Sequence, residues 1–159
     1  MNSVLVIVLS LILAACAGPI AKGSKFIKHT YIANNASLVY LYKPYSNDGV
    51  TVCLKVLLND IERGCLSGKG FIRLNLEPGN YKVVLKPDAF LTHNLMEFDV
   101  SLQPNQVSYF EYTTTSDTPP KDAVAKRFYS FAGISGHNLI VEREENDALK
   151  TLSRLFESN

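Results

Sequence analysis

A strict alternation of apolar and polar residues, repeated along the chain, constrains the fold more than any other feature of this sequence. It is clearest over residues 96–103, where Met, Phe, Val and Leu take every second position and Glu, Asp, Ser and Gln lie between them. Because successive side chains of a β-strand point to opposite faces, this segment predicts a strand with one buried and one solvated face. A chain that repeats the pattern is expected to be built mainly from strands.

Six further segments are rich in strand-forming residues, most of them with the same period of two. They are residues 38–43, 50–58, 61–66, 72–76, 81–85 and 107–114. Turn residues separate them, among them Asn59-Asp60 and Glu77-Pro78-Gly79-Asn80, so neighbouring segments are expected to form hairpins. Strands at this spacing, joined by short turns, predict a small antiparallel β-sandwich.

The C-terminal part departs from this pattern. Asp117-Thr118-Pro119-Pro120-Lys121 ends the run of strands, and residues 139–141 form one last short strand. Beyond Glu142, after a group of acidic residues, the apolar residues recur at helical spacing as Ala148, Leu149, Leu152, Leu155 and Phe156. We expect a C-terminal amphipathic α-helix that packs against the sandwich; an exposed helix that binds a partner is the alternative.

The N-terminus carries a signal of another kind. A mostly apolar run begins at Val4 and ends in Leu13-Ala14-Ala15-Cys16, and it is shorter than the roughly 20 residues that a membrane-spanning helix needs. The last four residues resemble the bacterial lipobox. That resemblance implies cleavage after Ala15 and acylation of Cys16 by a diacylglycerol group on the thiol and a fatty acid on the amine. No Lys or Arg precedes the run, which favours the alternative of an uncleaved hydrophobic N-terminus.

The lipobox resemblance also implies a location and a division of the chain. Ala17, rather than Asp, after the cysteine resembles lipoproteins that are sent to the outer membrane, so a lipid anchor facing the periplasm is expected. Residues 1–15 form the signal peptide, 16–36 the lipidated N-terminus and a tether, 37–115 the sandwich, and 116–159 a C-terminal extension of the same domain. Within the tether, Phe26 and Ile27 are apolar enough to dock onto the domain instead.

The charge balance bears on the kind of partner. The chain has 16 Lys and Arg against 15 Asp and Glu, all of them after Cys16. Nucleic-acid binding depends on a basic surplus gathered on one face, so DNA and RNA are excluded as expected partners. Because Trp is absent, aromatic packing must come from the eight Tyr and eight Phe residues.

Several of these landmarks together resemble a known family. They are Leu38-Val39-Tyr40-Leu41-Tyr42-Lys43-Pro44, Val56-Leu57-Leu58-Asn59-Asp60 with Gly64 and Leu66 beyond it, Gly70-Phe71, and Leu76-Glu77-Pro78-Gly79-Asn80-Tyr81. They are similar to a group of bacterial lipoproteins catalogued only as a domain of unknown function, DUF2846, over about residues 37–115. The resemblance implies a sandwich akin to transthyretin-like and carboxypeptidase-regulatory modules, and it implies no activity.

Cys53 and Cys65 lie on the two strands of one expected hairpin, and the strand register decides whether they can form a disulfide. A two-residue turn at Asn59-Asp60 places Leu54 opposite Cys65 and turns Cys53 to the other face. A three-residue loop places Cys53 directly opposite Cys65, but it also sets Lys55 against Arg63. The disulfide and a pair of small thiols both remain open.

The sequence offers little catalytic chemistry. His29, His93 and His137 stand far apart, and none belongs to a spacing typical of metal ligands, so no metal site and no cofactor are expected. Residues 133–137 only partly match a nucleophile elbow, because Gly is missing two positions after the serine, and they are expected to form a flexible loop. No catalytic residue is assigned.

Two hypotheses on function follow. The first is a non-enzymatic envelope module that binds a protein or a cell-envelope polymer, with exposed tyrosines as a candidate partner surface. The candidates are Tyr40, Tyr42, Tyr45, Tyr109 and Tyr112, and the aromatic segment Phe128-Tyr129-Ser130-Phe131 offers further material. Each of these rings could instead complete the core of a chain without Trp. The second hypothesis is a periplasmic hydrolase with His93 or His137 as general base, which requires a nucleophile and a carboxylate within hydrogen-bond reach.

Overall fold

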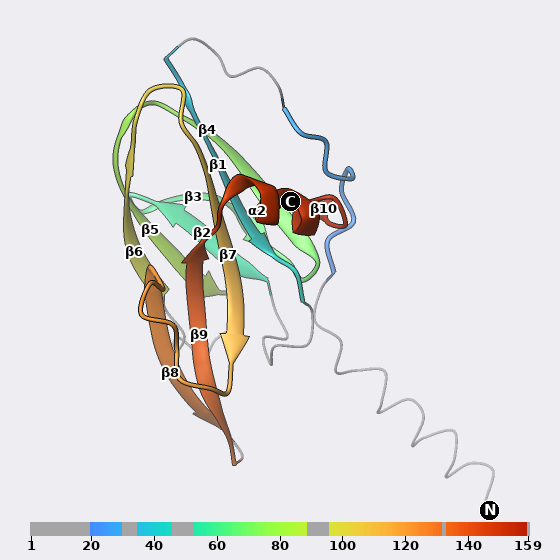
Figure 1. Ribbon diagram of the computed structural model, residues 1–159, viewed down its shortest axis with the longest axis vertical. Helices are drawn as coiled ribbons and strands as arrows, with labels where there is room; N and C mark the ends of the chain where they lie inside the picture. Colours follow the sequence, from blue (N-terminus) through green and yellow to red (C-terminus); the bar gives the residue numbers. More distant parts are fainter. Residues whose placement is uncertain (1–19, 30–34, 46–52, 89–95, 132, 159) are drawn as a thin grey trace, which may run out of the picture.

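Two β-sheets pack against each other, and one helix covers the outer side of the larger sheet (Figure 1). This arrangement is seen in a computed structural model that describes residues 20–29, 35–45, 53–88, 96–131 and 133–158. The expectation of a mainly β protein with a short helix near the C-terminus is confirmed.

The strands divide into a sheet of six and a sheet of four. The larger sheet has the order β10-β4-β1-β7-β9-β8, and the smaller has the order β3-β2-β5-β6. In chain order the elements are β1 (Ser37–Lys43), β2 (Leu54–Leu58), β3 (Ile61–Leu66), β4 (Gly70–Leu76), β5 (Gly79–Pro87), β6 (Met96–Leu102), β7 (Val107–Thr115), β8 (Ala125–Phe131), β9 (Ile134–Glu142), α2 (Glu145–Leu152) and β10 (Phe156–Glu157).

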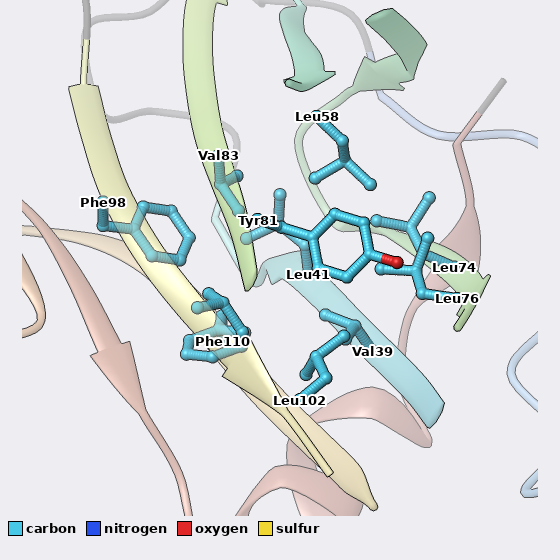
Figure 2. Close-up of a pocket in the computed structure, with 11 residues that line it drawn as sticks. Val39, Leu41, Leu58, Leu74, Leu76, Tyr81, Val83, Phe98, Leu102 and Phe110 are labelled. Atoms are coloured by element: carbon cyan, nitrogen blue, oxygen red, sulfur yellow. The ribbon is translucent and has the colours of Figure 1, made fainter. Parts of the chain in front are cut away.

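The main core lies between the two sheets. The inward side chains of β6 that the alternation predicted, from Met96 to Leu102, are all at most 8% exposed, and they meet residues of the larger sheet such as Leu41 and Phe110. The packing leaves a small apolar cavity of about 10 Å³, lined by residues of both sheets (Figure 2). That volume is at the lower limit for one water molecule, so this cavity is a packing gap and not a ligand site.

A second core covers the opposite face of the larger sheet. There Tyr40, Phe71 and Tyr109 pack under the helix α2, whose Ala148 and Leu152 are fully buried. The helix thus turns its apolar stripe to the sheet, as the favoured alternative expected. Leu155 is also buried, although α2 ends at Leu152.

Two strand pairings depart from the antiparallel arrangement that the sequence predicted. β1 runs parallel to β7, with Leu38 opposite Val107, and β10 runs parallel to β4. Parallel neighbours need a long connection. The chain between β1 and β7 supplies it, because β2, β3, β5 and β6 form the other sheet before β7 returns beside β1.

The segment expected as a tether is in part docked onto the domain. The Ala21 amide donates to Gly68 O at 3.0 Å, and Gly23 N donates to Glu157 O at 3.1 Å. Phe26 packs edge-on against Tyr40, with 5.4 Å between the ring centroids. Hydrogen bonds to distant parts of the chain therefore hold this segment on the domain, as the docking alternative for Phe26 expected, whereas Ile27 is 76% exposed.

The first described residues meet the last ones at one place, which we call the terminal junction: Ile20–Ser24, Ser67–Gly70 and Phe156–Ser158. Ser158 N donates to Phe71 O at 2.8 Å, and Ser67 N donates to the hydroxyl of Ser158 at 3.1 Å. A side chain at Gly70 would meet the Ser158 hydroxyl, the Ala21 methyl and Ser67 O. Glycine at position 70 is therefore what allows the three segments to approach.

The β2–β3 hairpin takes a register that neither sequence alternative contained. Asn59 and Asp60 both have positive φ, as a two-residue hairpin turn requires, but Arg63 is an extra residue between the pairs Leu57–Glu62 and Val56–Gly64. This bulge shifts the register so that Lys55 lies opposite Cys65. Cys53 and Cys65 then form a disulfide, with their Cα atoms 5.5 Å apart.

The region beyond β7 differs most from the sequence expectation. β8 was not predicted, and β9 is nine residues long where only residues 139–141 were expected. Residues 134–137, expected in a flexible loop, are part of β9 and pair with β8. That prediction was wrong because backbone pairing with β8 holds these residues in an extended conformation. The local sequence does not indicate this pairing.

We expect the disulfide to stabilise the fold by about 3 kcal/mol, the entropy cost that closing a loop of this length removes from the unfolded chain. The two cysteines are 12 residues apart. Urea unfolding with and without reductant measures the difference. The Cys53→Ala/Cys65→Ala double variant serves as control, since its midpoint should not respond to reductant. A wild-type midpoint that does not respond either would contradict the prediction.

We expect Gly70→Ala to destabilise the terminal junction by about 1–3 kcal/mol, the usual range for forcing extra volume into packed structure. Its methyl group would lie 2.7 Å from the Ala21 methyl and 2.9 Å from Ser67 O. Thermal unfolding and the rate of tryptic cleavage at Lys22 and Lys25 both report the effect. Lys69→Ala, at the exposed neighbouring position, should leave both unchanged; equal behaviour of the two variants would refute this explanation.

Candidate functional site: the β8–β9 hairpin

The hairpin of β8 and β9 reaches past the rest of its sheet. Thr115, the last residue of β7, pairs with His137, so β8 is the only described strand that pairs with residues 134–136 of β9. Figure 1 shows the end of this hairpin extending beyond β7. β8 is also the last strand of the sheet, so no strand among the described residues pairs with its outer backbone edge. Such edges are ready sites for pairing with another chain.

Exposed apolar side chains lie on both faces of the hairpin. Phe128 is 60% exposed, and its ring contacts that of His137 edge-on, 5.4 Å between centroids. Ile134 is 68% exposed, and it lies three residues before His137 on β9, so the alternation along that strand puts it on the face opposite Phe128 and His137. Large exposed apolar residues on an unpaired edge are typical of binding surfaces.

A hollow of about 400 Å³ lies where β8 starts beside β6. Met96 and Glu97 line it from one side, and Ala125, Lys126 and Arg127 line it from the other. The part of β8 from Phe128 onward lies outside this hollow. The hollow therefore flanks only the start of β8.

Four of the five tyrosines expected as a partner surface lie in the core, and that prediction was wrong for them. Tyr40, Tyr42, Tyr109 and Tyr112 are at most 4% exposed. The reason is that both faces of β1 and β7 are covered, one by the smaller sheet and the other by α2 and the N-terminal segment. Tyr45 alone is exposed, at 63%.

A polar network joins these buried tyrosines to the start of α2. The Arg143 guanidinium donates through Nε to Glu111 at 2.8 Å, and the Tyr42 hydroxyl donates to the same carboxylate at 3.5 Å. Burial raises the pKa of Tyr42 above its usual range, and the negative charge of Glu111 raises it further. A buried tyrosine that keeps its proton in this way supplies no base at neutral pH.

A second pair of contacts ties down the beginning of the helix. The Tyr109 hydroxyl donates to Glu145 at 3.5 Å, and Lys28 forms an ion pair with the same carboxylate at 2.7 Å. Burial and the Glu145 charge raise the pKa of Tyr109 to about 12, whereas Lys28 lowers the pKa of Glu145. Both contacts hold α2 on the sheet.

The described histidines are not arranged for hydrolysis. His137 Nδ1 is buried without a hydrogen-bond partner among the described residues, and its ring faces Phe128. His29 accepts a hydrogen bond from Arg73. His93, the other candidate base, lies outside the described residues, as do Ala15 and Cys16 of the predicted cleavage and acylation site.

One cluster of side chains has the composition of a metal site. The sulfurs of Cys53 and Cys65 and a carboxylate oxygen of Asp88 lie within 4.8 Å of one another. Metal binding requires thiolates, and here the two sulfurs are bonded to each other. Asp88 instead forms an ion pair with Lys55 at 3.1 Å. The oxidised cluster is therefore structural.

The fold defines a two-sheet β protein with one covering helix, and comparison with known proteins assigns it to a family. Residues 33–126 match the family model DUF2846, described as a protein of unknown function. The match spans more than half of the chain, so this chain belongs to that family. No curated protein and no solved structure matches it. Most of the β8–β9 hairpin, with α2 and β10, lies beyond the matched residues.

The structure also bears on membrane insertion. Among the residues that it describes, no helix is long and apolar enough to cross a bilayer.

We expect the stability of the protein to fall as the pH rises from about 10 to about 12. An unfolded tyrosine loses its proton near pH 10, whereas Tyr109 keeps its proton to about pH 12 in the folded state, so stability is complete below pH 10 and declines above it. Urea unfolding at several pH values measures the slope. Tyr109→Phe should flatten it, while Tyr45→Phe, at an exposed tyrosine, should not; equal slopes in the two variants would contradict the assignment.

Proposed function

We propose that this chain is a bacterial lipoprotein, cleaved after Ala15 and held in the outer membrane by acyl chains on Cys16, with its folded domain facing the periplasm. The lipobox-like sequence Leu13-Ala14-Ala15-Cys16 supports this proposal. The Cys53–Cys65 disulfide supports it too, because disulfides persist in oxidising compartments such as the periplasm. The domain is proposed to be a sandwich of the transthyretin and carboxypeptidase-regulatory kind.

The proposed activity is binding without catalysis, with an envelope protein or a cell-envelope polymer as the partner. The observation that carries it is the projecting β8–β9 hairpin, which offers a backbone edge that no described strand pairs with, together with exposed Phe128 and Ile134. An extended segment can add to such an edge as a further strand; backbone hydrogen bonds then provide affinity and the side-chain contacts provide specificity. The surroundings of His137 give no support to the alternative of a hydrolase.

The lipid anchor is tested by mass spectrometry of the protein purified from membranes. The expected chain begins at Cys16 and carries acyl groups, and Cys16→Ser should leave the protein uncleaved and without them. A mature chain that retains Met1, or one with an unmodified Cys16, would overturn the localisation.

Binding through the hairpin is tested by crosslinking in intact envelopes, followed by identification of the linked molecule. We expect the acylated wild-type protein to give one dominant product and Phe128→Ser/Ile134→Ser to lose most of it, because the variant removes both exposed apolar side chains. Ile61→Ser is the matched control, since Ile61 is 57% exposed on β3, an edge strand of the other sheet. Unchanged thermal unfolding of the variants separates loss of binding from loss of fold. If the hairpin variant gives the wild-type product, the hairpin is not the binding site.

A further inference from the structure

Only a short piece of chain separates the proposed acylation site from the folded domain. Ile20 already pairs with Gly68, and the Ala21 amide donates to Gly68 O. Four residues lead from Cys16 to Ile20, and a fully extended chain spans at most about 3.6 Å per residue, so the two Cα atoms lie within about 14 Å of each other. By contrast, a strand of nine residues such as β5 or β9 is about 30 Å long. The domain is larger than the reach of its anchor.

We propose that the terminal junction is the face of the domain that lies against the phospholipid surface holding the anchor. This inference rests on the proposed acylation of Cys16. Acyl chains buried in the bilayer fix Cys16 at the level of the headgroups, and the domain is joined to it through Ile20. Residues 21–24 of the junction are hydrogen-bonded to Gly68 and Glu157, so this end of the anchor segment is part of the folded domain.

The junction has side chains that suit a lipid surface. Ile20 and Phe156 are 42% and 39% exposed. Lys22, Lys25 and Lys69 are also exposed, and each lies near one of these two residues, either along the chain or across the sheet. None of these lysines forms an ion pair with a described residue. Exposed apolar groups beside lysines are typical of surfaces at the headgroup layer, where each lysine raises affinity for anionic lipid about fivefold.

The absence of Trp from the chain allows a direct test with single tryptophan reporters. Phe156→Trp places the reporter in the junction, on a strand that lies 140 residues after Cys16 in the chain. Phe128→Trp is the matched control: the same substitution at another exposed phenylalanine, on β8. β10 and β8 are the two outer strands of the six-stranded sheet, about 24 Å apart at the spacing of neighbouring strands.

The acylated full-length variants are reconstituted into vesicles whose phospholipids carry a nitroxide on the headgroup, which quenches tryptophan at short range. We expect Phe156→Trp to lose a large part of its emission relative to unlabelled vesicles, and Phe128→Trp to keep its emission. Quenching that is absent at position 156, or equal at the two positions, overturns the proposed orientation. Ile20→Trp, a second reporter in the junction, keeps the test decisive should Phe156→Trp not fold.

The mass of each reconstituted protein separates this proposal from the one on which it rests. A chain without acyl groups overturns both. An acylated chain with an unquenched junction reporter overturns only the orientation and leaves the lipid anchor standing.

Discussion

The burial of β1 on both faces is the constraint on which the rest of this structure depends. All seven residues from Ser37 to Lys43 are buried. Val39 and Leu41 contribute to the core between the sheets, whereas Leu38, Tyr40 and Tyr42 contribute to the core under α2. A strand of this kind needs two coverings and two neighbours. The smaller sheet and the helix cover its two faces, and β4 and β7 pair with its two edges. The parallel β7 follows all four strands of the smaller sheet in the chain.

The same double burial explains which parts of the fold the sequence could predict. In β6 apolar and polar residues alternate strictly because one face of the strand is solvated. The alternation therefore predicts the bounds of the strand, Met96 and Leu102. β1 and β7 carry apolar or aromatic residues on both faces. Their residue types predict strands, but they do not show whether Tyr40 and Tyr109 are buried or exposed. Covering depends on α2 and on Phe26, which are distant in the sequence. The candidate surface of tyrosines was misplaced for this reason, and only Tyr45, beyond the end of β1, is exposed.

Other features depend on a single residue or on pairing with a distant segment. The turn at Asn59-Asp60 was predictable from residue types, but the extra residue at Arg63, which changes the register before Cys65, was not. β8 has no clear alternation, and its pairing with β9 is what makes both of them strands. The hairpin that carries the candidate binding surface was therefore absent from the sequence prediction, although Phe128 was among the aromatic residues available to it.

The terminal junction has a consequence for how such a chain acquires its structure. In a chain made from its N-terminus, Ile20 is formed long before Ser158, yet the segments around these two residues share one network of hydrogen bonds. Ala21 can bond to Gly68 early, whereas the hydrogen bonds of Gly23 and Ser24 with Glu157 can form only once the strand β10 has been made. It also follows that a peptide fused to the C-terminus would emerge beside Ala21 and Gly70, where Ser158 is only 9% exposed and little free volume remains.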